Sequence, residues 1–184
     1  MSGLQHFANE SCDEVAYNAA RSNWYAVQTR SRQEKKLLRQ LECDGFTSFL
    51  PLLNRVSHWS DRQKIIQEPL FAGYLFVRIH WTPENRNAVL RKPGAVTLVG
   101  SKGLGTPIPD KQIDDIKTLL ARNVEWKHSP FLQAGDKVRV RGGALDGMEG
   151  ILLRENRDKT LVISVDAIQR SLSIRVTGYV LEKI

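Results

Sequence analysis

The sequence contains few of the residues from which metal sites and disulfide frameworks are built. Its 184 residues include two cysteines, Cys12 and Cys43, which lie far apart in the chain, and four scattered histidines. Structural zinc sites need cysteines and histidines at short, regular spacings, and the sequence offers no such spacing. Two widely separated cysteines fit a reduced compartment. We therefore expect a cytoplasmic protein with no metal and no cofactor.

Long hydrophobic runs are also missing. No stretch approaches the roughly 20 apolar residues needed to span a bilayer, and the first residues lack the apolar core of a signal peptide. We therefore expect no membrane contact. The mixed polar composition of residues 1–22 instead predicts a flexible tail.

Acidic residues are outnumbered by basic ones. The chain has 27 Lys and Arg against 20 Asp and Glu, which gives a net charge of +7. A positive balance favours a polyanionic partner such as nucleic acid, because each neutralised phosphate releases counterions. The alternative is a charge that only keeps the protein soluble. A hydrophobic content of 41% is enough for a packed core.

The first two thirds of the chain alternate strand-like and helix-like segments. Ser31 and Glu34 match the capping box at a helix start, Thr82 and Pro83 match a cap followed by a first-turn proline, and Asp110 can cap a third helix. We expect a hairpin with arms 53–59 and 64–68. The other predicted strands are 24–29, 46–50, 73–80 and 95–99.

The last third predicts strands almost throughout, at 137–141, 150–155, 160–165, 171–175 and 180–183. The fold class is therefore an α+β domain followed by an all-β barrel. The predicted boundaries are a tail at 1–22, a first domain at 23–122, a linker at 123–130 and a barrel at 131–184.

The first barrel strand carries a recognisable pattern. Val138 and Val140 alternate with basic residues, which predicts a buried face and a basic outer ladder. Asp146-Gly147 is a tight-turn dipeptide, and Gly150 occupies a position where a side chain would crowd a neighbouring backbone. This stretch resembles the KOW motif of proteins that act on or beside nucleic acid.

Residues 71–79 are the most apolar strand of the first domain. Leu75, Val77 and Ile79 share one face, while Tyr74 and Phe76 lie on the other. If helices cover only the aliphatic face, the aromatic face is open to a partner. Bases could stack there, or an apolar protein helix could dock. The strand lacks the leading cation and the final aromatic of the RNA-recognition signature, so protein docking is favoured.

Several ordered motifs together resemble the NusG family of transcription elongation factors. They are the run 24–29, the basic helix after it, the strand 71–77, Pro93-Gly94-Ala95-Val96, Val99-Gly100 and the KOW stretch. The resemblance covers residues 23–184. It implies a ferredoxin-like NGN domain, a linker and an SH3-like KOW barrel, without enzymatic activity.

The resemblance also implies a monomer whose partner is RNA polymerase, gripped at the clamp helices of its largest subunit. The polymerase-binding residues it implies are Trp24, Phe71, Tyr74, Phe76, Ser101 and Lys102. Upstream or non-template DNA would face the basic helix, and nascent RNA is a further candidate ligand. The nucleic-acid-binding residues it implies are Arg32, Lys35, Lys36 and Arg39; a merely solvated helix face is the alternative.

The barrel departs from the general family pattern. Met148 stands where phenylalanine is usual, and Ile168-Gln169-Arg170 stands where Phe-Gly-Arg is usual. By resemblance, Met148, Ile168 and Arg170 are partner-binding residues, but recruitment of a ribosomal protein or of Rho is in doubt. The variant favours specialised paralogues similar to RfaH, UpxY and LoaP, which act in antitermination. Some RfaH proteins refold the barrel into helices, but β-branched residues over 162–176 predict strands here.

Two other functions stay open. A ribosome- or RNA-binding KOW module without polymerase affinity would use the barrel alone. A hydrolase using Asp110 and His128 is disfavoured, because no motif links these residues.

Overall fold

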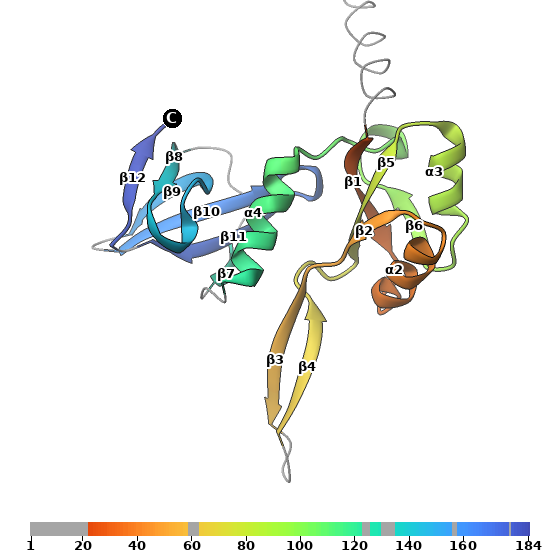
Figure 1. Cartoon of the computed structure of the whole chain (residues 1–184), viewed down its shortest axis with the longest axis horizontal. Helices are drawn as coiled ribbons and strands as arrows, with labels where there is room; N and C mark the ends of the chain where they lie inside the picture. The colour runs from red at the N-terminus through yellow and green to blue at the C-terminus, as the bar shows by residue number, and fades with distance from the viewer. Residues whose placement is uncertain (1–21, 59–62, 123–125, 130–134, 156–157, 177) are drawn as a thin grey trace, which may run out of the picture. The chain divides into compact units, whose positions relative to one another are not determined.

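The computed structural model describes residues 22–58, 63–122, 126–129, 135–155, 158–176 and 178–184 (Figure 1). The chain divides into two compact units, each made of two sequence segments. The first unit contains the described residues up to Leu50 together with Ala72–Pro107. The second contains Pro51–Phe71 together with Ile108–Ile184. The predicted flexible tail lies outside the described residues, except for Ser22.

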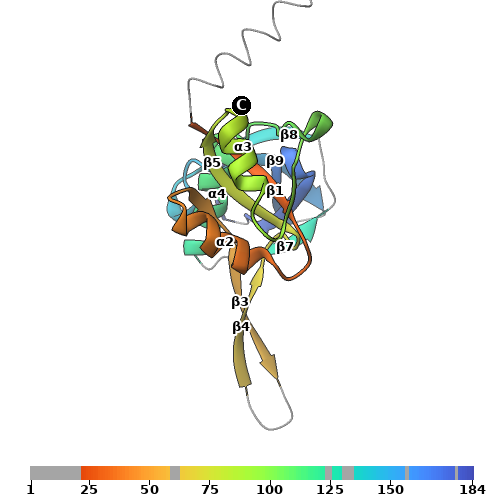
Figure 2. The ribbon, with the colours of Figure 1, turned by 90° about the vertical axis from the view of Figure 1, so that its right-hand side faces the viewer.

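A four-stranded antiparallel sheet forms the first unit, with strand order β2-β5-β1-β6. Its elements are β1 (Ser22–Thr29), α2 (Glu34–Cys43), β2 (Thr47–Phe49), β5 (Tyr74–His80), α3 (Pro83–Leu90), β6 (Ala95–Leu98) and the short 3₁₀ helix η1 (Ser101–Gly103). Figures 1 and 2 show α2 and α3 on the same side of this sheet. All four predicted strands are confirmed.

One face of this sheet is aliphatic and packs into the core. The register pairs Val27 with Leu75 and Tyr25 with Val77, so these side chains share a face. All four are buried, as are Leu37 and Leu41 of α2. Since α2 and α3 lie on one side of the sheet and bury aliphatic residues, we infer that they cover this face.

At the edge of the same core, Tyr25 contacts the Trp81 ring at a centroid distance of 5.1 Å. Burial raises the pKa of the Tyr25 phenol, and a hydrogen bond with Asn23 partly offsets that rise.

The start of α2 differs from the capping box predicted for Ser31 and Glu34. The helix begins at Glu34, and the preceding residue makes no side-chain cap hydrogen bond. The Glu34 carboxylate instead accepts a hydrogen bond from the backbone N–H of Gly73, at 2.9 Å. A local capping motif is thus replaced by a bond to a residue 39 positions away. The end of α2 is followed by Gly45 in the left-handed region at φ +82°, a conformation that glycine commonly adopts after a helix.

The start of α3 confirms its prediction. Thr82 has an extended backbone, and its hydroxyl accepts from the Asn85 N–H at 3.2 Å. Pro83 is the first helical residue, where its missing N–H costs no helical hydrogen bond.

The second unit contains a two-stranded hairpin, a helix and a six-stranded sheet. The elements are β3 (Leu52–His58), β4 (Gln63–Pro69), α4 (Asp110–Ala121), β7 (Trp126–Ser129), β8 (Asp136–Arg141), η2 (Gly143–Leu145), β9 (Glu149–Glu155), β10 (Asp158–Val165), η3 (Asp166–Ile168), β11 (Arg170–Arg175) and β12 (Val180–Lys183). The sheet order is β12-β8-β9-β10-β11-β7, and β3 and β4 form a separate two-stranded sheet. The hairpin is as predicted, with its tip at 59–62 outside the described residues.

The five predicted barrel strands are all present, and a sixth joins them. Residues 123–130 were expected to form a linker, but Trp126–Ser129 form β7 and pair with β11. This part of the prediction was wrong, because a four-residue strand of mixed polarity has no alternation that distinguishes it from a loop. Residues 123–125 and 130 lie outside the described part, and the domain boundaries themselves stay a prediction.

The KOW stretch folds as its sequence indicates. Val138 and Val140 are buried, whereas Lys137 and Arg141 are exposed. Gly147 adopts φ +78° in a turn closed by the Met148 N–H and the Leu145 carbonyl. A β-carbon at Gly150 would lie under 3.0 Å from the Val162 carbonyl oxygen, so the predicted close approach is confirmed.

Helix α4 is attached to the barrel within the second unit. Lys111 donates to the Gly147 carbonyl at 2.7 Å, and Gln112 donates to Asp166 Oδ2 at 2.9 Å. Asp110 was expected to cap the helix; it is instead its first residue, and Pro109 occupies the cap position without a side-chain bond. None of the described helices is long and apolar enough to cross a bilayer.

Candidate functional site

The second face of the four-stranded sheet carries aromatic side chains from three strands. The register pairs Trp24 with Arg78, Gln28 with Tyr74, and both Ala26 and Phe49 with Phe76. We call Trp24, Phe49, Tyr74 and Phe76 the aromatic face. The Phe49 and Phe76 rings stack at a centroid distance of 6.2 Å and an interplanar angle of 28°. Tyr74 and Phe76 share this face, as the sequence predicted, and Phe49 joins them although it was not predicted.

Most of the aromatic face is buried, whereas an open face was expected if helices covered only the aliphatic side. Trp24 is 4% exposed and Phe76 is 0% exposed. Phe71, in the segment before β5, is 4% exposed. Tyr74 and Phe49 are half-buried, so only they offer ring surface to a partner in the structure as it stands. Alternation along a strand determines which residues share a face but does not determine whether that face is covered.

The loop after β6 presents the other predicted contact residues. Ser101 and Lys102 are both exposed. Lys102 adopts φ +53°, which is uncommon for a residue with a side chain. An Arg86 guanidinium N–H donates to the Gly103 carbonyl at 3.4 Å, which ties this loop to α3. Binding by Ser101 and Lys102 stays a prediction.

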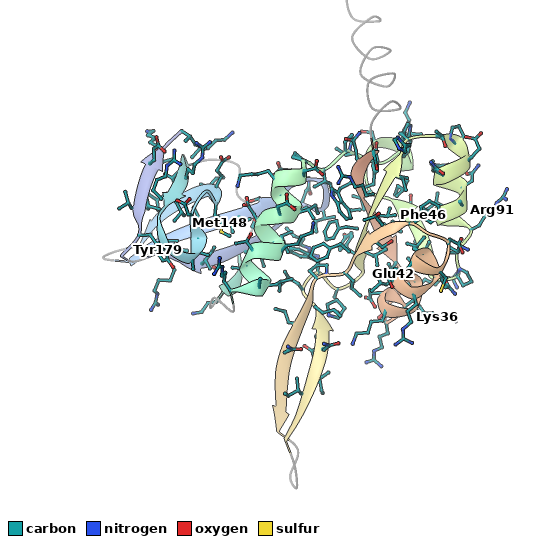
Figure 3. The ribbon with its side chains drawn as sticks, viewed as in Figure 1. Lys36, Glu42, Phe46, Arg91, Met148 and Tyr179 are labelled. Atoms are coloured by element: carbon teal, nitrogen blue, oxygen red, sulfur yellow. The ribbon has the colours of Figure 1, made fainter. Side chains whose placement is uncertain are left out.

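The basic residues of α2 form an exposed stripe. Arg32, Lys35, Lys36 and Arg39 are all exposed. The spacing of Lys35, Lys36 and Arg39 places them along one side of the helix. Figure 3 shows Lys36 pointing away from α2, and Arg32 lies in the turn before the helix. We call these four residues the basic stripe. The opposite side of α2 carries the buried residues Leu37 and Leu41. Exposure is what a nucleic-acid contact requires, but such a contact is a prediction here.

The structure shows that the segment between α3 and β6 lies next to α2, which the sequence did not indicate. The Arg30 N–H donates to the Gly94 carbonyl at 2.8 Å, and Lys92 forms an ion pair with Asp44 at the other end of α2. The segment between α3 and β6 therefore runs beside α2, and it carries the exposed Arg91, which Figure 3 shows apart from Lys36. Pro93-Gly94 is typical of a turn, but the sequence does not show that α2 lies beside that turn.

The predicted basic outer ladder of the barrel is largely neutralised by acids. Arg139 pairs with Glu149 at 2.7 Å, and Arg141 pairs with Glu182 at 2.5 Å. Lys183 pairs with Asp136 at 2.8 Å on the same two strands. A polyanion would have to displace these partners, which weakens this surface as a candidate for nucleic acid.

Two of the three predicted partner-binding residues of the barrel lie in its core. Met148 is 1% exposed and Ile168 is 5% exposed, while Arg170 is exposed. The expectation of direct partner contact by Met148 and Ile168 is therefore not supported by their positions. Both were assigned by resemblance, from positions where the sequence departs from the general pattern, and their apolar side chains instead fill the core of the barrel.

A pocket of about 440 Å³ lies between α4 and the outer side of the barrel, within the second unit. Its lining includes Lys111, Asp115, Glu149 and the backbone at Gly150. Desolvation by burial raises the pKa of the Asp115 carboxyl; its hydrogen bond and ion pair with Lys111 lower it in part, and the nearby Glu149 charge adds to the rise. Among the described residues no group of three or more His, Cys, Asp or Glu could hold a metal ion.

These observations describe surfaces suited to binding: an aromatic sheet face, a basic stripe and a barrel. Comparison with known proteins places them in a family. The NusG family model, described as transcription termination factor nusG, matches residues 22–117, just over half of the chain. That segment contains both the aromatic face and the basic stripe.

Individual relatives cover more of the chain. The transcription termination/antitermination protein NusG of Chlamydia trachomatis is 29% identical over 150 residues, which are 74% of this chain and 80% of that protein. The protein of the same name from Lactococcus lactis is 28% identical over 174 residues, which are 88% of this chain and 92% of that protein.

A solved structure described as "Domain interaction in Thermotoga maritima NusG" has a TM-score of 0.50 and 23% sequence identity, and covers 90% of this chain and 99% of that one. This likeness supports the predicted fold class, an NGN domain followed by a KOW barrel. The family match over residues 22–117 and the relatives that extend across the barrel identify the chain as a member of the NusG family.

Proposed function

We propose that this chain regulates transcription by binding RNA polymerase and promoting processive elongation and antitermination. The observation that carries the proposal is the family match over residues 22–117, the segment that holds both candidate surfaces of the first unit. The names of the matching relatives, which refer to transcription termination and antitermination, support the same process. The protein would act by binding, without chemistry of its own.

In this proposal the aromatic face and Phe71 bind the clamp helices of the largest polymerase subunit. Aromatic side chains are typical anchors in protein interfaces, and burying one contributes about 1.5–3 kcal/mol. Tyr74 and Phe49 are accessible for a first contact. Trp24, Phe71 and Phe76 must become uncovered before they can contribute. Ser101 and Lys102 would provide a second contact with polymerase.

The basic stripe would contact upstream or non-template DNA. Its four cations lie on α2 and in the preceding turn, and each can neutralise a phosphate without reading a base. Such a contact would stabilise the complex on DNA of any sequence. Binding of nascent RNA by the same stripe is a further proposal, since its phosphates offer the same charge.

We further propose that the protein belongs to the specialised branch similar to RfaH, UpxY and LoaP. Met148 and Ile168-Gln169-Arg170 differ from the general pattern of the barrel, and Met148 and Ile168 fill its core. The altered loops argue against recruitment of a ribosomal protein or of Rho, and Arg170 is the exposed candidate for a different partner.

Transcription with purified bacterial RNA polymerase, on a template that carries a pause and a terminator, tests the function. The protein should shorten the pause and increase read-through, and Tyr74→Ala should reduce both effects. Glu42→Ala, an exposed change on α2 away from the aromatic face, is the control and should behave as wild type. Unchanged pausing and read-through at saturating wild-type protein would refute the proposal.

The alternative of a KOW module that binds RNA without polymerase finds little support in the barrel, because acids pair the basic ladder of β8. Its test is salt-dependent RNA binding by the full chain with Arg139 and Arg141 changed to glutamine. A shorter fragment starting at residue 131 would remove β7 from the sheet. Strong RNA binding that depends on these two arginines, without polymerase binding, would favour the alternative.

A further inference from the structure

Gly73 is held by two hydrogen bonds at the start of the aromatic strand β5. Its N–H donates to Glu34 Oε1 at 2.9 Å, and its carbonyl accepts from the Thr29 N–H at 2.8 Å. It adopts φ +84°, a conformation that glycine tolerates and most other residues avoid. Tyr74, the accessible tyrosine of the aromatic face, follows it directly.

The Glu34 side chain bonds to Gly73 and does not form the predicted capping box at the start of α2. As the first residue of α2 it carries negative charge at the helix N-terminus, where the helix dipole is favourable. Glu34 is only 6% exposed to solvent. Placing a carboxylate out of water is costly unless it is hydrogen-bonded, and a bond to a charged group is stronger than one between neutral groups. The part-buried Glu34–Gly73 bond is therefore a specific link between α2 and β5.

Residues 30–34, which include Glu34, are also held by the turn at Gly94. The Arg30 N–H donates to the Gly94 carbonyl, and a β-carbon at Gly94 would lie 2.9 Å from the Gln33 β-carbon. Residues 30–34 are thus held between the turn that precedes β5 and the turn that precedes β6. Arg32 lies within this segment at φ +60°. The first cation of the basic stripe and the first residue of the aromatic strand are connected through Glu34 and Gly73.

We propose that Glu34 is the positioning residue of the polymerase-binding surface. Its carboxylate fixes the backbone of Gly73, which sets where Tyr74 projects and how the aromatic face is placed relative to the basic stripe. A ligand surface that is already arranged for its partner loses less conformational freedom on binding, which improves affinity without adding a contact. This inference rests on the proposed function, since it assigns the determinant of affinity within that surface.

A merely structural role for Glu34 predicts a different result. Any buried hydrogen bond contributes to stability, so loss of stability alone does not show positioning. Thr82 supplies a matched control in the same unit, because its hydroxyl caps α3 and loss of that cap hydrogen bond destabilises the helix. Thr82→Ala should lower the melting temperature without changing the turn at Gly73.

The experiment compares full-length wild type, Glu34→Ala, Glu34→Gln and Thr82→Ala. It measures the affinity for purified core RNA polymerase well below the melting temperatures, together with the exchange rate of the Gly73 amide proton by NMR. Glu34→Ala should bind polymerase about tenfold more weakly and exchange Gly73 faster, since a charge-assisted bond is lost. Glu34→Gln keeps an acceptor oxygen and should restore most of the affinity. Thr82→Ala should bind as wild type.

Each other outcome has a distinct meaning. Wild-type affinity in Glu34→Ala, while wild type itself binds polymerase, would overturn the positioning role and leave the proposed function intact. Equal weakening by Thr82→Ala and Glu34→Ala would reduce Glu34 to a stabilising residue and also overturn it. Failure of wild type to bind polymerase would overturn the proposed function and this inference with it.

Discussion

Gly150 and Val162 approach so closely that the barrel has no room for a β-carbon between them. A β-carbon at Gly150 would lie under 3.0 Å from the Val162 carbonyl oxygen and 3.0 Å from the Leu161 side chain. Gly150 pairs with Val138 on its other side, in β8. Three strands of the KOW barrel therefore meet at a residue that the sequence alone marked as a close approach.

Gly150→Ala should destabilise the barrel by about 1–3 kcal/mol, because the methyl group meets backbone that cannot move aside without disturbing the sheet. Gly142→Ala is the matched control. Gly142 has φ +79° and no atom within 4 Å of its β-carbon position, so it tests backbone strain without crowding. Chemical denaturation of both variants should show the larger loss for Gly150→Ala. If both variants lose the same free energy of unfolding, crowding by the Val162 carbonyl is not the reason that Gly150 must be glycine.

The basic stripe predicts a measurable salt dependence. Each phosphate contact contributes about 0.9 to the slope of log affinity against log salt for duplex DNA. Changing Lys35 and Lys36 together to glutamine should therefore reduce the slope by about 1.8 and weaken binding to duplexes of unrelated sequence equally. Titrations at several salt concentrations provide the measurement.

The control for the basic stripe removes the same charge elsewhere. Lys127 and Lys137 are exposed lysines of the second unit. Their double change to glutamine should leave the slope near the wild-type value. If both double variants lose the same affinity for DNA, the loss is caused by the lower net charge of the protein. The basic stripe would then be a solvated helix face and no specific DNA contact.

Asp115 predicts a pH-dependent stability of the second unit. Its folded pKa is raised above the ordinary value of 3.8 by burial, so between these two values the folded state binds more protons than the unfolded state. The free energy of unfolding should therefore rise as pH falls through this window. Asp115→Asn removes the titration. The stability difference, wild type minus Asp115→Asn, should increase from about pH 7 to about pH 4; a constant difference would contradict the assignment.

Local sequence signals predicted the elements whose causes are local. The threonine cap of α3 and the turn at Gly147 depend on a few neighbouring residues, and both are present. The alternation of β8 predicted its buried valines for the same reason. The close approach at Gly150 is a tertiary contact, and a glycine within a strand pattern was the local signal that indicated it.

Features set by distant contacts escaped prediction. Glu34 matched a capping box, but its carboxylate accepts a hydrogen bond from the backbone N–H of Gly73, 39 residues away, in place of the local bond. β7 is too short to show a period, and its pairing with β11 determines its conformation. The burial of Trp24 and Phe76 likewise depends on what covers the aromatic face, which a strand pattern does not contain. Met148 was assigned to a contact surface by resemblance and belongs to the core.

The most direct test of the account is the affinity of the purified chain for core RNA polymerase, with Tyr74→Ala as the decisive variant. Tyr74 is half-buried, so its truncation should leave the fold and the melting temperature close to those of wild type. The account predicts measurable wild-type binding that Tyr74→Ala weakens at least about tenfold, the equivalent of one lost aromatic anchor. Binding of equal strength by wild type and Tyr74→Ala would contradict it.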